Sequence, residues 1–225
     1  MTKELAKVVK QVIAYEIDNK LVKILEEELK DHKNIKIIHQ DFLKAKISDD
    51  INSINEFKRI MVISNLPYYI TTPIILKLLE ENYISEFYLM MQKEVGERLT
   101  SLPGRKEYGS LSVLMEYKTE SKVVFTVSRN CFFPKPEIES VVVKIRKKEP
   151  SIKVKKENEF LNFIRIIFQQ RRKTLVNNIT SYYQTSKENL RNLLVSLGFK
   201  ENVRSEDLDL NDIHKVYIGL FESPN

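Results

Sequence analysis

The stretch VISNLPYYITTP, Val62 to Pro73, leaves an apolar β-type run and enters the tetrapeptide NLPY. The amide oxygen of Asn65 and a neighbouring backbone carbonyl can accept both hydrogens of an exocyclic amine. Pro67 fixes its own φ and removes a competing N–H, and Tyr68 offers a ring on which a flat base can stack. The tetrapeptide therefore predicts a pocket for the amino group of a nucleobase. The alternative is an ordinary turn after a strand.

Two acidic residues stand at comparable places earlier in the chain. Glu16 ends an apolar run in AYEID, where a carboxylate can bind both hydroxyls of a ribose. Asp41, in HQDF, can accept from an adenine amine while Phe42 packs near the ring. Each acid has a common alternative: Glu16 can be a solvated loop residue, and Asp41 can cap a helix or turn.

The segment CFFPKP, Cys131 to Pro136, places two adjacent aromatic residues before a Pro-x-Pro loop. A phenylalanine on such a loop can stack on a base, and a core phenylalanine is the alternative. Because adjacent side chains diverge, one of Phe132 and Phe133 is expected to serve only packing. Cys131 is read as inert, since no histidine lies close to it in sequence.

The segment QQRRKTL follows an apolar helical pattern and gathers Arg171, Arg172 and Lys173. Such a cluster can contact phosphates and so supply salt-dependent affinity for a nucleic acid. A solvated basic surface is the alternative for each residue taken singly.

Alternating strand and helix patterns must position these residues. Strands are predicted at 11–17, 35–39, 59–64 and 87–91, with helices at 19–30 and 73–80 between them, and further strands at 121–127 and 140–146. This alternation predicts an α/β fold with a parallel sheet, whose strand ends would bring Glu16, Asp41 and Asn65 to one edge. The lysine-rich stretch 144–156 is a candidate linker, so we expect a first domain over 1–148 and a small all-helical domain over 149–225.

Composition limits the classes of function. The 225 residues are 42% hydrophobic and 30% charged, and the net charge of +6 favours a polyanionic partner. One cysteine and three scattered histidines argue against disulfides and against a metal site. Since no apolar run is long enough to span a membrane and the N-terminus lacks a signal-peptide core, a cytoplasmic protein is expected.

Five segments in this order closely resemble the small-subunit ribosomal RNA adenine dimethyltransferases, the KsgA/RsmA family: NLPYYITTPI, MMQKEVGERL, YGSLSVLMEY, CFFPKPEIESVVVKI and FQQRRKTLVNN. The resemblance covers nearly the whole chain. Erythromycin-resistance rRNA methyltransferases share the general plan, but YITTPI and QRRKTL resemble the former group.

The resemblance implies a class I, Rossmann-like methyltransferase fold that uses S-adenosylmethionine to dimethylate the N6 amines of two adjacent adenosines near the 3′ end of small-subunit rRNA. It implies that Glu16, Asp41, Phe42 and Asn65 bind the cofactor. It also implies that Asn65, Leu66, Pro67 and Tyr68 hold the amine, and that Phe132 completes the stack on the base. The implied partner is the rRNA of the precursor small subunit, during ribosome biogenesis, with the protein a monomer and without metal.

One departure from the family stands out. Members carry a glycine-rich loop after their first strand, close to the methionine part of the cofactor, whereas this chain has no glycine before Gly96. The opening MTKELAKVV resembles the helix that follows that loop, so the sequence is interpreted as N-terminally truncated, without the loop and without the first strand. Neighbouring strands are then expected to have an unpaired edge.

Two other functions remain open from the sequence. The departure favours a catalytically inactive RNA-binding or ribosome-assembly protein. The NLPY motif alone is equally compatible with an adenine-N6 methyltransferase acting on large-subunit rRNA or DNA.

Overall fold

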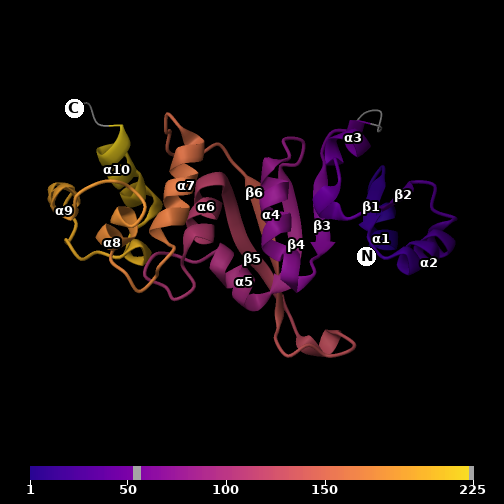
Figure 1. Ribbon diagram of the computed structural model, residues 1–225. Coiled ribbons are helices and arrows are strands. Elements are labelled where there is room, and N and C mark those ends of the chain that lie inside the picture. Colours follow the sequence, from indigo (N-terminus) through magenta and orange to yellow (C-terminus); the bar gives the residue numbers. More distant parts are fainter. Residues whose placement is uncertain (53–56, 223–225) are drawn as a thin grey trace. The chain divides into compact units, whose positions relative to one another are not determined.

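The structure, a computed structural model, describes residues 1–52 and 57–222 (Figure 1). These residues divide into two compact units. The first unit comprises the described residues of 1–59 and 70–83, and the second comprises those of 60–69 and 84–225. Both units are therefore built from two separate segments of the chain.

The first unit contains a two-stranded parallel sheet and helices. Its strands and helices are β1 (Val12–Glu16), β2 (Ile35–His39), α1 (Thr2–Ala6), α2 (Asn19–Leu29), α3 (Ile47–Asn52), α4 (Thr71–Glu80) and the 3₁₀ turn η1 (Phe42–Lys44). Glu16 lies opposite His39 in the register of the two strands. The carboxyl ends of β1 and β2 therefore coincide, as the sequence predicts.

Helix α2 begins where the sequence indicates, because the Asp18 carboxylate accepts from the Lys20 backbone N–H at 2.7 Å and caps it. The apolar face of α2 is buried only in part. Leu29 is 5% exposed, but Leu21 and Ile24 are 46% and 53% exposed. A two-stranded sheet offers too narrow a surface to cover the whole apolar stripe of this helix.

The second unit contains a four-stranded sheet in the order β3-β4-β6-β5. Its strands are β3 (Met61–Asn65), β4 (Glu86–Gln92), β5 (Thr119–Val127) and β6 (Ser140–Lys147). β3 and β4 are parallel, whereas β6 runs antiparallel to both β4 and β5. The expected parallel sheet is therefore mixed in this unit. A β5–β6 connection without a crossover helix requires that antiparallel pairing.

Instead of one continuous sheet, the described strands form two sheets. β1 pairs only with β2, and β3 pairs only with β4, among the residues that the structure describes. β1 and β3 therefore each have one edge that no described strand pairs, in agreement with the expectation of unpaired edges.

Helix α5 (Lys93–Leu99) packs against β4, β5 and β6, and α6 (Ser110–Lys118) packs against β5 (Figure 1). The close approach of α5 depends on Gly96. A Cβ atom there would overlap Val141 Cγ2 and would lie 3.2 Å from Val143 Cγ2, on β6. The glycine thus fixes the distance between the helix and the sheet.

The remaining helices of the second unit surround an aromatic core. They are α7 (Glu157–Ile167), α8 (Leu175–Thr180), α9 (Lys187–Ser196) and α10 (Leu210–Phe221), with the 3₁₀ turn η4 (Ser205–Asp207). The rings of Phe160 and Phe163 pack on Tyr217, with centroids 5.1 and 5.6 Å apart. Tyr108 and Tyr117, from the α6 region, belong to the same buried cluster. The described part of 149–225 is helical without strands, as predicted, and the domain boundary near residue 148 stays a prediction.

Candidate functional site

The NLPY segment leaves the sheet at the carboxyl end of β3. Asn65 is the last residue of the strand and is exposed. The pairing with β4 continues one residue further, since the Leu66 N–H donates to the Met90 carbonyl at 3.0 Å. The Leu66 side chain is 3% exposed and anchors the turn. The strand end is thus fixed by backbone pairing and burial, which leaves the Asn65 amide at the surface for another role.

The Tyr68 hydroxyl is 2.9 Å from the hydroxyl of Ser140, the first residue of β6. Because β6 is antiparallel to β4, Ser140 pairs with Gln92 at the carboxyl end of β4. Ser140 is fully buried. The hydrogen bond therefore joins two motifs that are far apart in sequence, NLPY and FFPKPEIES. Sequence reasoning missed Ser140, although a hydroxyl at the buried start of an apolar strand was a signal for it.

The residue that precedes β6, Glu139, is bonded to Lys93, the first residue of α5. The Lys93 N–H donates to the Glu139 carbonyl at 3.0 Å, and the Lys93 ammonium lies 3.1 Å from the Glu139 carboxylate. The hydrogen bond to Glu139 raises the pKa of Lys93. The segment between β5 and β6 thus ends at a fixed position beside the strand ends of β3 and β4.

Phe132 and Phe133 lie in that segment, after the 3₁₀ turn η3 (Arg129–Cys131). Phe132 is partly buried, whereas Phe133 is 102% exposed. Cys131 is exposed and carries a free thiol. The two adjacent rings therefore have different environments, but the expectation that one of them serves only packing is wrong, because Phe133 is fully exposed and Phe132 is only partly buried.

In the first unit, the two predicted acids both cap local turns. One oxygen of Glu16, Oε1, accepts from the N–H groups of Ile17 and Asp18 at 2.8 and 2.9 Å. One oxygen of Asp41, Oδ1, accepts from the Leu43 N–H at 2.9 Å. These bonds orient both carboxylates at the shared end of β1 and β2 and use one oxygen of each. Capping and ligand binding are therefore compatible at both positions.

The ring of Phe42 is held next to Asp41 by Tyr15. The two rings meet edge to face, with centroids 5.3 Å apart. The Tyr15 hydroxyl donates to the Asp50 carboxylate at 2.9 Å. Burial, and then this hydrogen bond, raise the pKa of Tyr15 well above its usual range, so the hydroxyl remains protonated. These contacts give the strand ends of the first unit two oriented carboxylates and a fixed ring, which suits a nucleoside.

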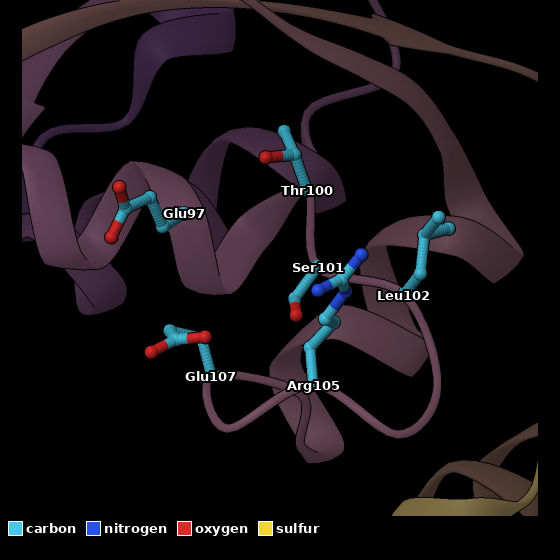
Figure 2. Close-up of a pocket in the computed structure, with 6 residues that line it drawn as sticks. All are labelled: Glu97, Thr100, Ser101, Leu102, Arg105 and Glu107. Carbon is cyan, nitrogen blue, oxygen red and sulfur yellow. The ribbon is translucent and has the colours of Figure 1, made fainter.

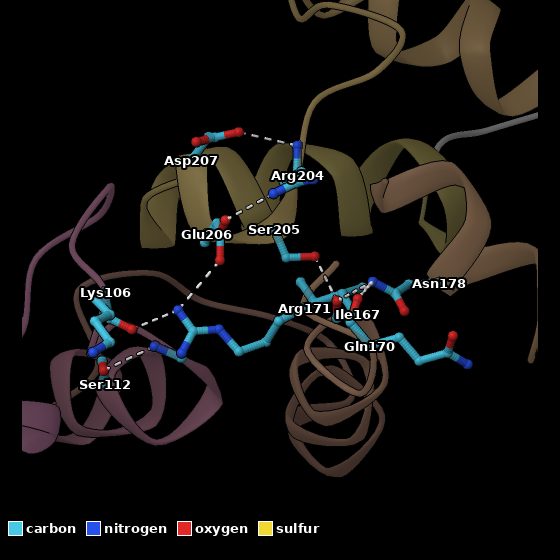
Figure 3. Close-up of polar contacts among 11 residues, drawn as sticks. Lys106, Ser112, Ile167, Gln170, Arg171, Asn178, Arg204, Ser205, Glu206 and Asp207 are labelled. Atoms are coloured by element: carbon cyan, nitrogen blue, oxygen red, sulfur yellow. Dashed lines mark hydrogen bonds and ion pairs between the residues drawn. The ribbon is translucent and has the colours of Figure 1, made fainter. Parts of the chain in front are cut away.

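The basic segment QQRRK connects α7 with α8, and its first arginine already has partners within the protein (Figure 3). The Arg171 guanidinium donates to the Lys106 carbonyl at 2.6 Å and lies 3.3 Å from the Glu206 carboxylate. The buried Asn178 amide donates to the carbonyls of Ile167 and Gln170 at 2.8 and 3.2 Å, which fixes the start of the segment. Arg172 and Lys173 are exposed.

An open hollow of about 430 Å³ follows α5 (Figure 2). Charged and polar side chains line much of it, including Glu97, Arg105 and Glu107. It contains none of the residues predicted to do chemistry. Over residues 1–52 and 57–222, no cluster of three metal-ligating side chains occurs and no helix is long and apolar enough to cross a membrane.

Two solved structures share the fold over almost the whole chain. The crystal structure of a dimethyladenosine transferase from Plasmodium falciparum matches with a TM-score of 0.78 and 26% identity, over 98% of this chain and 86% of that one. The 23S rRNA methyltransferase ErmE matches in fold with a TM-score of 0.72 and 24% identity, over 97% of this chain and 85% of that one. With the sheet order above, these likenesses define a class I, Rossmann-like methyltransferase fold.

Sequence comparison narrows the class to one family. The profile described as "Ribosomal RNA adenine dimethylase" matches residues 1–220. "Ribosomal RNA small subunit methyltransferase A" of Macrococcus caseolyticus is 44% identical over 100% of this chain and 78% of its own length. The protein of that name from Bacillus cereus strain B4264 is 43% identical over 94% of this chain and 75% of its own length. The chain belongs to the ribosomal RNA adenine dimethylase family.

Proposed function

We propose that this protein transfers methyl groups from S-adenosylmethionine to the N6 amines of two adjacent adenosines near the 3′ end of small-subunit rRNA, in the cytoplasm, during ribosome biogenesis. The observation that carries the proposal is the family match over residues 1–220, in a chain that keeps NLPY at the end of a strand. The names of the relatives support the small subunit as the partner.

The residues at the ends of β1 and β2 suit the cofactor. Glu16 offers a carboxylate for ribose hydroxyls, and Asp41 offers one for an adenine amine. The ring of Phe42, held by Tyr15, supplies an apolar surface beside them. When bound, S-adenosylmethionine supplies an electrophilic methyl group on sulfur.

The NLPY residues would orient the target amine. The Asn65 amide oxygen and the carbonyl of Leu66 or Pro67 accept the two N6 hydrogens, which favours a more tetrahedral nitrogen. The N6 lone pair, otherwise delocalised into the ring, would then be directed at the methyl carbon, and the N–C bond would form as the bond from that carbon to sulfur breaks and leaves a neutral thioether. The charged amine product loses its proton to water, so no protein base is needed. Tyr68 and Phe132 would hold the adenine between their rings.

Phosphate contacts would come from the segment between α7 and α8. Arg172 and Lys173 are exposed there, and Arg171 braces the segment through Lys106 and Glu206. Such contacts supply affinity and orientation more than sequence choice. We therefore propose that residues 149–225 form the small helical domain that positions the rRNA.

Methyl transfer to isolated ribosomal subunits tests the function. With labelled S-adenosylmethionine, we expect the 225-residue chain to modify two adjacent adenosines of small subunits that lack these methyl groups, and to leave large subunits and duplex DNA unmodified. The Macrococcus caseolyticus relative serves as the positive control. Calorimetric titration of the cofactor into both proteins measures binding separately from transfer.

Two outcomes would contradict the proposal. Modification of large subunits instead would support a large-subunit methyltransferase. Binding to small subunits without binding of the cofactor would support an assembly protein without catalytic activity.

The bond between Tyr68 and Ser140 gives a further prediction within this function. Ser140→Ala removes the partner of the Tyr68 hydroxyl, and we expect a fall in the rate of methyl transfer of about tenfold, equivalent to about 1.4 kcal/mol. Tyr68→Phe removes the same bond from the other side. Because both changes delete one interaction, the double variant should be no slower than the slower single variant. Fully additive losses in initial rate would show that the bond does not position the ring.

A further inference from the structure

The most exposed aromatic side chain among the described residues is Phe133. Its relative exposure is 102%, so it makes no contribution to the core. It lies in the segment Ser128–Glu139, which extends beyond the end of the sheet between β5 and β6 (Figure 1). Leaving a phenylalanine in water forgoes about 1.5–3 kcal/mol of burial energy. A ring in this position adds nothing to the stability of the fold, so it is available to bind another molecule.

The backbone separates this ring from its neighbour. Phe132 has φ −119° and ψ 148°, an extended conformation in which successive side chains point to opposite sides. Phe132 is partly buried and Phe133 is not. The two rings therefore cannot lie against the same face of one base. If Phe132 stacks on the target adenine, Phe133 is available to a different group.

Local hydrogen bonds hold the segment that presents Phe133. Ser128 accepts from Asn130 N–H through its hydroxyl at 3.3 Å and from Cys131 N–H through its carbonyl at 3.0 Å. The Arg129 guanidinium donates to the Glu137 carbonyl at 3.4 Å, across the loop. The segment begins and ends at the pair formed by Val127 and Ser140, and Ser140 is the residue that shares a hydrogen bond with Tyr68. The ring is thus presented by a braced loop that begins next to the proposed amine pocket.

The segment that carries Phe133 is charged and polar; it exposes Glu137 besides two cations, and Ile138 is 43% exposed. Arg129 and Lys135 are exposed in the same segment. An exposed ring with cations on the same loop is an arrangement that binds unpaired bases and their phosphates. RNA recognition commonly uses aromatic side chains in this way, because an unstacked base of any identity presents a flat face.

We propose that Phe133 stacks on an unpaired base that flanks the target adenosine, and so holds the strand open while the target occupies the pocket. This inference rests on the proposed function. It makes Phe133 a substrate-positioning residue, and it specifies the substrate as single-stranded RNA with an unstacked nucleotide next to the methylated one. The exposed cations Arg129 and Lys135 would contact the phosphates of the same nucleotides.

Fluorescence of a base analogue tests the stacking directly. The probe is an RNA hairpin with two adjacent adenosines in its loop and 2-aminopurine next to them, because stacking on an aromatic ring quenches 2-aminopurine. We expect quenching by the wild-type chain and by Phe133→Trp. Phe133→Ala should abolish the quenching and weaken binding of the hairpin by roughly tenfold, within the range for loss of one base–aromatic stack.

Controls separate this inference from folding and from the proposed function. Tyr83→Ala removes another exposed ring, ahead of β4, and should leave quenching and affinity unchanged. Because Phe133 is outside the core, the thermal midpoint of Phe133→Ala should equal that of the wild type.

If Phe133→Ala retains quenching and affinity while the wild type methylates small subunits, the inference fails and the function stands. If the wild type neither binds the hairpin nor methylates small subunits, both fail. Dissociation of a wild-type dimer by Phe133→Ala in sedimentation would assign the ring to a second copy and would also overturn the inference.

Discussion

Asn65→Ala is expected to slow methyl transfer by roughly 10²- to 10³-fold, the range measured when one hydrogen-bonding group that stabilises a transition state is removed. The amide oxygen is the one side-chain acceptor proposed for the target amine, and alanine cannot replace it. Because Asn65 is exposed at a strand end, its loss should change neither the thermal midpoint nor the affinity for RNA. Initial rates of transfer to small subunits, beside binding isotherms for the same subunits, measure the two effects separately.

Two variants sharpen this test. Asn65→Asp keeps an acceptor of similar shape and should retain more activity than Asn65→Ala. Tyr69→Ala changes a neighbouring ring that is 85% exposed and has no proposed role, so it should transfer methyl groups at the wild-type rate. Wild-type transfer by Asn65→Ala would reduce NLPY to the ordinary turn that the sequence also allows.

Gly96→Ala is expected to lower the free energy of unfolding by about 1–3 kcal/mol, the usual cost of adding an atom to a packed interface. The added methyl group would overlap Val141 Cγ2. That side chain cannot easily rotate away, because valine is branched at Cβ and Val141 belongs to β6. Relief requires α5 to move away from the sheet. Since Ser140 precedes Val141, we also expect weaker positioning of Tyr68 and slower methyl transfer.

Gly219→Ala is the matched control for this prediction. It also places a methyl group in a helix, but the nearest atom is the flexible end of Leu193, whose Cδ1 lies 2.9 Å away. Alanine favours a helix over glycine by about 1 kcal/mol, which should offset a small rearrangement of that side chain. Urea unfolding of both variants measures the difference. Equal destabilisation of the two would show that the contact of α5 with β6 is not the cause.

Most elements could be predicted from local patterns, because strand and helix periodicity depends on near neighbours in the sequence. The strand at 35–39 is predicted to the residue, and α2 begins at Asn19, as predicted. The mixed pairing of β6 was not predicted, since strand direction depends on the β5–β6 connection. The division into two sheets was not predictable either, because it depends on which strands pair, whereas local patterns indicate only where strands occur.

The candidate site was predictable where its chemistry follows from residue type. Asn65, Glu16 and Asp41 each lie at or just after a strand end, as their spacing predicts. The partners of these and other site residues were not predictable. Ser140 meets Tyr68 only after β6 pairs with β4, and Arg171 meets Glu206 only after the helices of the second unit pack. Contacts between distant segments depend on the tertiary structure, which composition and periodicity do not specify.

The division of the chain between the two compact units has a consequence for synthesis. Residues 60–69, with NLPY, belong to the second unit, but they lie between two segments of the first. A ribosome that has released only residues 1–59 has therefore supplied neither α4 for the first unit nor β4 to pair with β3. The first unit can be completed only after residue 83 emerges, and the turn at Asn65 gains its strand partner only after β4 follows. An excised fragment of either unit must carry two pieces of chain, so truncation at residue 59 separates α4 from the strands of its own unit.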